Sequence, residues 1–307
     1  IDHIAPVKDK NLISRLEECA VKALLSGDKS VWFAVPVVIE WETIIGFRYT
    51  PQGETFDDIL TEDVLGALKS SLVEFEQLKQ KRVLVIDSTT NEVRESWPVS
   101  RCLYGEIQLE SEEYCITDGR WYKVDNTYSD TINRDYETTK ISDIVFPDYT
   151  KNHNGEKDYN KELADSSNTL LLMDRENIPY GGGRSRIELC DVLSSDGKLI
   201  HVKRYGGSSV MSHLFNQGLI SMDLIKSEPS FVEKANQSIA QKDPQGAFAI
   251  SDNSTTEVVY GIVTSDNSDL PNIPFFSKVA FHHVKKRLKT MGVAVSIGAI
   301  HEANKID

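Results

Sequence analysis

The 307-residue sequence predicts an α/β fold, in which a C-terminal mixed sheet is flanked by helices and an N-terminal α+β region precedes it. Three observations support this fold class. Strand-like and helix-like apolar patterns alternate along the chain, two apolar runs flank an Asp-Gly turn, and a helical pattern directly follows the second run. An α+β arrangement of the whole chain is the alternative.

The domain organisation follows from changes in composition along the chain. Residues 1–125 are expected to form the N-terminal α+β region. Residues 126–161 are polar and poor in aliphatic side chains, which is typical of a linker with short helical pieces. Residues 162–307 then form the C-terminal domain. The helices and strands expected in the N-terminal region cover residues 11–26, 30–40, 61–79 and 82–87.

Composition places the chain among folded proteins that do not span a membrane. Hydrophobic residues make up 40% of the sequence, which is enough for sizeable cores. No apolar run is long enough to cross a bilayer and no signal segment opens the chain, so we expect a cytoplasmic protein. The first residue is Ile rather than Met, which suggests a missing N-terminal portion. The four cysteines lack zinc-type spacing, and free thiols are expected.

The charge distribution restricts the kind of partner. A formal net charge of −13 argues against a protein that coats nucleic acid non-specifically. A local basic cleft is still compatible with this balance, because several basic residues gather around the predicted hairpin. These residues are Arg184, Arg186, Lys198, Lys203 and Arg204.

The centre of the C-terminal domain is predicted to be a β-hairpin followed by a helix. The runs 187–193 and 199–205 are rich in Ile, Leu and Val and flank the Asp-Gly turn. A Gly-Gly pair ends the second run, and apolar residues at helical spacing follow Ser208 or Ser209, either of which can cap the helix.

Polar residues occupy positions that a purely structural hairpin does not require. Glu188 and Asp191 fall on the first strand, and His201 and Lys203 fall on the second. Gln217 lies on the following helix. The structural alternative is that Lys203 is a solvated strand residue and that Asp191 merely ends its strand.

This layout of an acidic strand, a turn, a strand with lysine and a helix resembles the restriction-endonuclease-like, or PD-(D/E)xK, nucleases. The pattern here is Asp191…His201-Val202-Lys203. In that family two carboxylates hold a divalent metal ion, and the lysine orients or activates the attacking water. The resemblance therefore implies a Mg²⁺ or Mn²⁺ cofactor, with Lys203 positioning water or stabilising phosphate charge.

The ligand set departs from the pattern of the nuclease family, because His201 stands where the family has Glu or Gln. Imidazole suits manganese or zinc better than magnesium. Either the metal preference differs, with His201 as an additional ligand or base, or Glu188 supplies the second carboxylate, or the site is inactive. Asp174, which ends the apolar run 169–174, is a third carboxylate candidate beside Asp191.

The register of the hairpin decides which carboxylate faces the lysine, because side chains alternate between the two faces of a strand. A two- or four-residue turn pairs Asp191 with Val202 and leaves Glu188 on the face of Lys203. A three- or five-residue turn, or a bulge, instead puts Asp191 on that face, as the nuclease resemblance requires. The sequence leaves both registers open.

Two sets of candidate site residues follow from this interpretation. The catalytic set contains Asp191, His201, Lys203 and Gln217, with Asp191, Glu188 and Asp174 as metal ligands. The residues expected to contact nucleic acid are Arg184, Arg186, Arg204, Ser208, Ser209 and His213.

Longer stretches resemble a sporadically distributed family of uncharacterised bacterial proteins. The resemblance rests on YGGGRSRIELCDVL, LIHVKRYGGSSVMSHLFNQGLIS and IPFFSKV and covers most of the chain. The patchy distribution of that family implies mobile or defence-associated genes.

The leading hypothesis is a divalent-metal-dependent nuclease, or a nuclease-derived domain, that acts on DNA more than RNA in bacterial defence. The alternative is a non-catalytic subunit that binds nucleic acid or another protein. The sequence is compatible with an oligomer. Metal-dependent cleavage separates the two hypotheses.

Overall fold

The computed structural model describes the chain except for residues 1–2, 39–42, 69–73, 181–184, 266 and 304–307. The chain divides into two compact units that are each built from several segments. Unit 1 comprises Ile1–Arg134, Gly206–Val210 and Ile273–Lys278, and unit 2 comprises Asp135–Tyr205, Met211–Asn272 and Val279–Asp307. None of the described helices is long and apolar enough to cross a membrane.

Unit 1 contains a five-stranded sheet of order β1-β8-β7-β6-β2 and a three-stranded sheet of order β3-β4-β5. Its elements are β1 (Ile4–Pro6), α1 (Lys10–Ser26), β2 (Val31–Phe33), β3 (Ile44–Arg48), α2 (Thr61–Leu68), α3 (Phe75–Gln80), β4 (Arg82–Asp87), β5 (Val93–Pro98), η2 (Val99–Cys102), β6 (Leu103–Leu109), β7 (Glu112–Thr117), β8 (Arg120–Val124) and α4 (Asn126–Glu137), the last of which ends in unit 2.

The expected helix over 11–26 is confirmed as α1, whose ends carry clear signals. The Asp9 side chain accepts hydrogen bonds from the first backbone N–H groups, and Gly27 ends the helix in the left-handed conformation, with φ of 70°. The apolar face of α1 packs into the core of unit 1. Where a single helix over 61–79 was expected, the structure describes α2 and α3, and residues 69–73 between them lie outside the described residues.

Unit 2 is organised around a six-stranded mixed sheet of order β10-β13-β14-β15-β16-β9, beside a two-stranded sheet of β11 and β12. Its elements are β9 (Lys140–Ile141), α5 (Glu156–Asp165), β10 (Leu170–Leu172), β11 (Asn177–Tyr180), β12 (Ser185–Glu188), β13 (Val192–Ser194), β14 (Lys198–Arg204), α6 (Ser208–Ser227), α7 (Pro229–Lys242), β15 (Glu257–Thr264), α8 (Phe275–Thr290) and β16 (Ala294–His301), with the first residues of α6 and α8 in unit 1.

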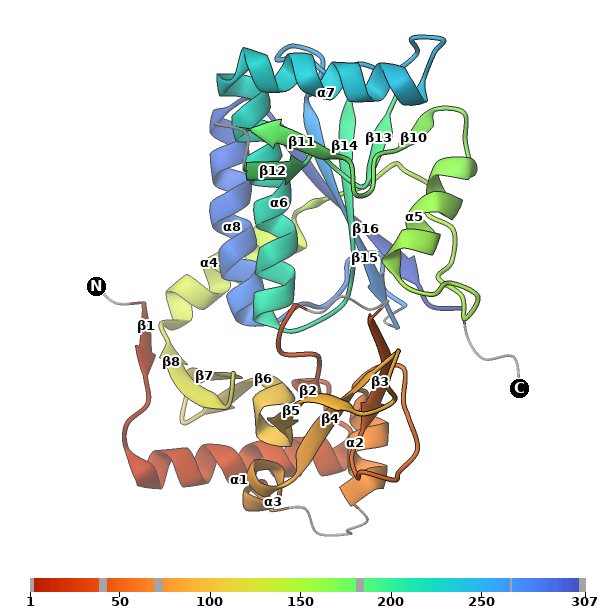
Figure 1. Cartoon of the computed structure of the whole chain (residues 1–307). Helices are drawn as coiled ribbons and strands as arrows, with labels where there is room; N and C mark the ends of the chain where they lie inside the picture. The colour runs from red at the N-terminus through yellow and green to blue at the C-terminus, as the bar shows by residue number, and fades with distance from the viewer. Residues whose placement is uncertain (1–2, 39–42, 69–73, 181–184, 266, 304–307) are drawn as a thin grey trace. The chain divides into compact units, whose positions relative to one another are not determined.

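The sheet of unit 2 changes from antiparallel to parallel pairing at β14. Strands β10, β13 and β14 are antiparallel neighbours, whereas β14, β15, β16 and β9 pair in parallel. Every residue of β15 is buried, as expected for a strand covered on both faces. Helix α5 covers one face, and α6 and α8 cover the other (Figure 1). The predicted mixed sheet flanked by helices is thereby confirmed.

The first strand of the predicted hairpin is divided in the structure. Residues 185–188 form β12, which pairs with β11, and the chain joins the large sheet only at Val192. The backbone therefore changes sheets between Glu188 and Val192. The second strand is confirmed, with β14 at Lys198–Arg204.

The segment 126–161, which was expected to be a linker, contributes folded elements to both units. It contains α4, β9 and the first part of α5, and the side chains of Ile132, Tyr136 and Tyr159 are buried. Because the exposed faces of these short helices carry polar side chains, the segment has the composition of a linker. The observed units divide after Arg134, not at the expected boundaries.

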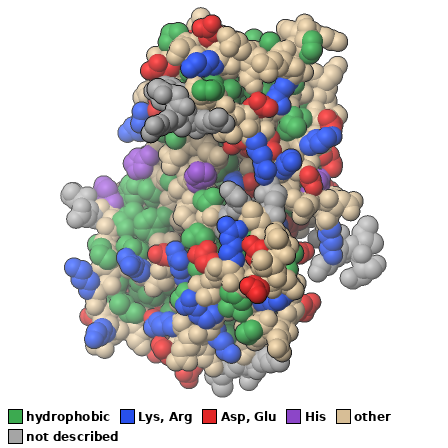
Figure 2. Space-filling model, in the orientation of Figure 1, with side chains coloured by type: hydrophobic (Ala, Val, Ile, Leu, Met, Phe, Trp, Pro, Cys, Tyr) green, Lys and Arg blue, Asp and Glu red, His purple; other side chains and the backbone are tan. Residues whose placement is uncertain are grey.

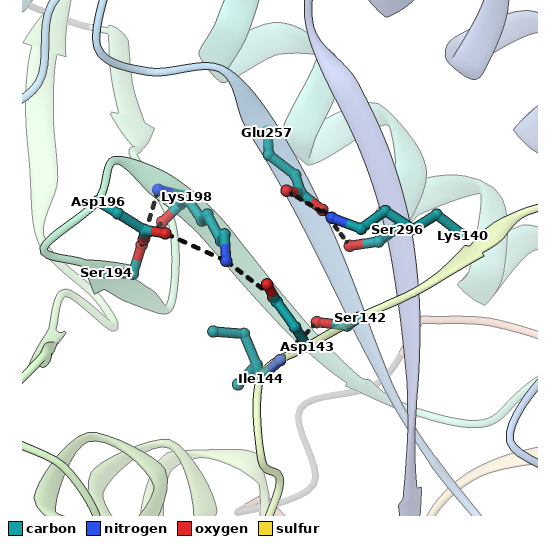
Figure 3. A network of polar contacts seen from close by, with 9 residues as sticks. All are labelled: Lys140, Ser142, Asp143, Ile144, Ser194, Asp196, Lys198, Glu257 and Ser296. Atoms are coloured by element: carbon teal, nitrogen blue, oxygen red, sulfur yellow. Dashed lines mark hydrogen bonds and ion pairs between the residues drawn. The ribbon is translucent and has the colours of Figure 1, made fainter.

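A polar network ties part of this segment to the first residues of the central strands (Figure 3). The Nζ of Lys140 lies 2.9 Å from Oε1 of Glu257, and the Ser296 hydroxyl donates to the same oxygen at 2.6 Å. The Nζ of Lys198 lies 2.7 Å from Oδ1 of Asp143. These charged groups thus hold β9 and the residues that follow it at the edge of the sheet.

Candidate metal centre

Three carboxylates that are distant in sequence meet where β10, β12 and β13 begin or end. Asp174 follows β10, Glu188 is the last residue of β12, and Asp191 directly precedes β13. One oxygen atom from each of these side chains lies within 4.8 Å of the other two. Oxygen ligands at this separation fit a hard divalent cation such as Mg²⁺ or Mn²⁺. These are the three residues that the sequence suggested as metal ligands.

Backbone hydrogen bonds of the neighbouring strands hold the carboxylates in place. Oδ2 of Asp191 accepts the Val202 N–H at 2.6 Å, within β14. Oε1 of Glu188 accepts the N–H of Arg175 at 2.5 Å. Arg175 has a φ of 61°, a left-handed conformation that is costly for a non-glycine residue. The turn after Asp174 is therefore held in a strained geometry that directs its N–H towards the cluster.

A buried amide adjoins the cluster. The Nδ2 of Asn160, on α5, lies 3.4 Å from Oδ1 of Asp174, and the residue is only 1% exposed. The Oδ1 of Asn160 has no hydrogen-bond partner within the described part of the chain. Buried polar atoms are normally satisfied, so an unpartnered oxygen beside three carboxylates fits a site that completes its contacts with an ion or its water.

Crowding and burial raise the proton affinity of the cluster. Burial, followed by the negative charge of Glu188, raises the pKa of Asp191 well above its ordinary value. Burial also raises the pKa of Glu188, with the nearby Asp174 adding to the effect, although the Arg175 N–H opposes it. The carboxylates therefore favour a bound proton or cation over three free negative charges.

Lys203 contributes a positive charge next to this cluster. Its Nζ lies 2.7 Å from Oε2 of Glu156, at the first turn of α5, and its charge lowers the pKa of Glu188. Lys203 and Glu156 also act on His213, whose pKa is lowered by desolvation and by Lys203 and raised in part by Glu156. Lys203, the lysine of the nuclease-like pattern, thus acts electrostatically on one carboxylate of the cluster.

His201 does not join the carboxylates. Its ring is 2% exposed, with the ring centroid 6.2 Å from that of Tyr260, and burial lowers its pKa to about 3. It is therefore a neutral core residue, and the group of clustered ligand atoms does not include it. Of the alternatives left open by the sequence, the geometry favours Glu188 as the second carboxylate.

The hairpin register explains how Asp191 reaches the site. Leu193 pairs with Leu199, and residues 195–197 connect β13 to β14. The hairpin therefore has the register of the three- or five-residue turn, which places Asp191 beside His201 and not Val202. The regular pairing ends there, because the Asp191 N–H donates to the Ile200 carbonyl while its side chain accepts from Val202.

The remaining candidates are less closely connected to the cluster. Arg204 pairs with Glu302 at 3.0 Å, and Gln217 is half-buried on α6. In unit 1, the hydroxyl of Ser208 lies 3.4 Å from that of Thr117, and the hydroxyl of Ser209 donates to the Pro36 carbonyl. Arg184 lies outside the described residues, and of Arg186 only the backbone, in β12, is described.

The basic residues expected to contact nucleic acid are thus partly neutralised. Acidic and basic side chains are interspersed over the face shown in Figure 2. Among the basic side chains near the hairpin, Lys198, Lys203 and Arg204 each have an acidic partner within 3.1 Å. The described surface around the cluster therefore lacks the excess of free positive charge that tight non-specific binding requires.

Sequence reasoning missed Glu156 and Asn160. Both lie in the segment that composition marked as a linker, and neither belongs to a recognisable motif. The signal that was available is the short helical pattern over 156–165, whose buried positions include Asn160. A polar residue at a buried helical position is a reason to look for a partner.

The fold and the cluster define the class of protein as a mixed α/β protein with an acidic centre at the ends of its strands. A family model described as a family of unknown function, DUF6119, matches residues 1–301. The chain therefore belongs to the DUF6119 family, in agreement with its resemblance to an uncharacterised family. No curated protein and no solved structure gives a significant match.

We expect the affinity for Mn²⁺ to increase as the pH rises from about 5 to about 8, because the metal must displace protons that Asp191 and Glu188 hold at raised pKa. Calorimetric titration in two buffers of different ionisation enthalpy would measure both the affinity and the protons released. An Asp143→Asn control, in which the changed carboxylate pairs with Lys198 away from the cluster, should behave as wild type. An affinity independent of pH would contradict the assignment of these ligands.

Proposed function

We propose that this protein is a divalent-metal-dependent nuclease that hydrolyses phosphodiester bonds. The observation that carries the proposal is the convergence of Asp174, Glu188 and Asp191, with one oxygen of each within 4.8 Å of the others. Lys203 adds the positive charge that the hydrolysis of a phosphodiester requires beside a metal ion. The orphaned oxygen of Asn160 supports the presence of a cation at this place.

The order of the elements also supports the proposal. The strand β13, a three-residue connection, the strand β14 with Lys203 and the helix α6 follow one another as in the restriction-endonuclease-like layout. Asp191 stands at the start of β13, and Lys203 lies near the end of β14. In an antiparallel pair these two positions lie at the same end of the sheet, so the topology brings the acid and the lysine together.

The donor set indicates the class of metal. The three residues offer only carboxylate oxygens, and His201 is buried elsewhere as a neutral ring. The argument for manganese or zinc over magnesium, which rested on imidazole, therefore loses its support, and the oxygen donors fit Mg²⁺ or Mn²⁺. A bound ion of this kind would supply Lewis-acid polarisation of a phosphate oxygen.

Each protein group then has a distinct role. Asp174, Glu188 and Asp191 hold the metal, and Lys203 orients the attacking water or stabilises the negative charge that develops on the phosphate. The attacking water loses a proton as its oxygen bonds to phosphorus, the bond from phosphorus to the leaving sugar oxygen breaks, and that oxygen takes up a proton, so the net exchange of protons is zero. The preference for DNA over RNA, the cytoplasmic location and the role in bacterial defence stay predictions from the sequence.

The test is the cleavage of linear DNA, circular DNA and RNA with Mg²⁺, with Mn²⁺ and with EDTA. We expect cleavage by the wild type to require the metal and to fall about 100-fold or more in Lys203→Ala, because the loss of a charged group at the reacting centre costs about this much. Lys198→Ala is the matched control, since Lys198 lies on the same strand and pairs with Asp143 and Asp196 instead.

The other outcomes are equally informative. If neither metal supports cleavage by the wild type, the nuclease proposal is wrong. Binding of nucleic acid that persists in both variants without cleavage would favour the non-catalytic subunit.

A further inference from the structure

We infer that Glu156 is a positioning residue that holds the Lys203 ammonium group for the reaction, an inference that rests on the proposed function. Lys203 carries a flexible four-carbon side chain, and such a chain has many rotamers to lose. A lysine that must act at one place on a phosphate needs a partner that limits this freedom. In this structure, Glu156 supplies that contact.

The contact is short and shielded. The Nζ of Lys203 lies 2.7 Å from Oε2 of Glu156, and the two side chains are 14% and 16% exposed. Ion pairs between exposed side chains contribute little, because water and salt screen them. A largely buried pair is screened less and keeps its geometry more strictly. This pair is therefore suited to fixing a position.

The carboxylate of Glu156 is itself anchored at both oxygens. While Oε2 accepts from Lys203, Oε1 accepts the backbone N–H of Arg204 at 3.0 Å. The acceptor thus spans two consecutive residues of β14 and cannot rotate without breaking one of these bonds. Glu156 is also the first residue of α5, where the helix dipole stabilises a negative charge.

The position of the pair relates it to the metal ligands. Glu156 raises the pKa of Asp191, and Lys203 lowers that of Glu188, so both charges act on the cluster. Asn160, which contacts Asp174, lies one helical turn after Glu156 on the same helix. Helix α5 therefore supports a metal ligand and the lysine together.

Glu156→Gln tests the inference, because the amide keeps an acceptor for the Arg204 N–H but loses the charge that holds Lys203. We expect kcat for DNA cleavage with Mn²⁺ to fall about 10- to 100-fold, as for the misplacement of a catalytic group by about an ångström. The Mn²⁺ dissociation constant, measured by direct titration, should change by less than about twofold, since Glu156 is outside the group of clustered ligands.

A double-mutant cycle separates positioning from an unrelated defect. If Glu156 acts through Lys203, Glu156→Gln combined with Lys203→Ala should be no slower than Lys203→Ala alone. Glu162→Gln is the matched control, because Glu162 lies on the same helix and pairs with His153 at 2.7 Å. This control should cleave at the wild-type rate.

Chemical labelling provides a measure that does not need activity. In the metal-free protein, acetic anhydride should acylate Lys203 slowly, because its side chain is mostly buried against Glu156. In Glu156→Gln, we expect acylation of Lys203, followed by peptide mass mapping, to be several-fold faster, with no change in Glu162→Gln. If the wild type fails to cleave, the proposed function fails, and labelling still decides whether Glu156 holds Lys203.

Several results would overturn the inference. Cleavage by Glu156→Gln at the wild-type rate would do so, as would penalties of the two substitutions that simply add. Weaker Mn²⁺ binding in proportion to the lost activity would make Glu156 a ligand instead of a positioning residue. Unchanged labelling of Lys203 would show that Glu156 does not restrain it.

Discussion

Asp191→Asn is expected to abolish metal-dependent cleavage, with a loss of about 1000-fold or more, and at the same time to raise the melting temperature of the metal-free protein. The activity is lost because a neutral amide is a poor metal ligand. The stability rises because the substitution removes a carboxyl group whose charged form is disfavoured by burial and by the neighbouring Glu188 and Asp174. The amide oxygen still accepts the Val202 N–H, so the fold keeps that bond. We expect a gain of about 1–3 kcal/mol at neutral pH.

The pH dependence of stability follows from the same residue. In the folded protein the pKa of Asp191 lies well above its value in the unfolded chain, so between the two values the folded state binds more protons. The stability of the metal-free wild type therefore falls as the pH rises from about 4 through the folded-state pKa. In Asp191→Asn this part of the decrease should be absent.

Asp196→Asn is a matched control for which we expect a change in stability of the opposite sign. Burial raises the pKa of Asp196, but hydrogen bonds from Ser194 and Lys198 outweigh it, and the net shift is downward. This carboxylate thus contributes stability that is present above its unfolded-state pKa and is lost as the pH falls through the folded-state value. Its removal should lower the melting temperature slightly. Denaturation of both variants by heat and by urea measures the contrast, and a lower melting temperature for Asp191→Asn would contradict our interpretation.

Gly197→Ala is expected to lower the free energy of unfolding by about 3 kcal/mol. Gly197 has a φ of 85°, and a Cβ atom there would lie 2.3 Å from the carbonyl oxygen of Ser254. The substitution therefore combines backbone strain with a collision against a backbone atom, which cannot move aside as a flexible side chain does. Urea denaturation gives the change in the free energy of unfolding.

Gly246→Ala separates the two causes. Gly246 has a φ of 73°, but a Cβ atom there would meet nothing within 4 Å, so only the strain applies. We expect a loss of about 1 kcal/mol. Equal losses in the two variants would show that the collision at Gly197 is relieved by a backbone shift.

The sequence predicted those parts of the structure that depend on neighbouring residues. The Asp-Gly turn, the strand β14 and the helix α1 are all specified by local periodicity and end signals, and all are observed. Asp174 was a candidate because it ends an apolar run, and Glu188 and Asp191 were candidates because they lie on the first strand of the predicted hairpin. Their convergence is a matter of strand pairing between distant segments, which the sequence alone left open.

Other features were hidden for identifiable physical reasons. The change of sheets between Glu188 and Val192 leaves no mark on the apolar run, because Leu189 and Cys190 are buried as Val192 is. His201 looks like a ligand by its position in a motif, but its contact with Tyr260 depends on the pairing of β14 with β15, a strand far along the chain. Glu156 contacts Lys203 only because α5 packs beside β14. Composition shows no more than that the segment around Glu156 is polar, so it does not indicate this contact.

The lengths of the outer strands in the unit 2 sheet affect the behaviour of the protein at high concentration. The sheet is bounded by β10, of 3 residues, and β9, of 2 residues, whereas β15 and β16 each have 8. Long outer strands invite pairing with other chains and lead to aggregation, and short ones limit it. Lys140, which pairs with Glu257, also places a charged residue in β9. The short outermost strands therefore protect the apolar central strands from pairing with strands of other molecules.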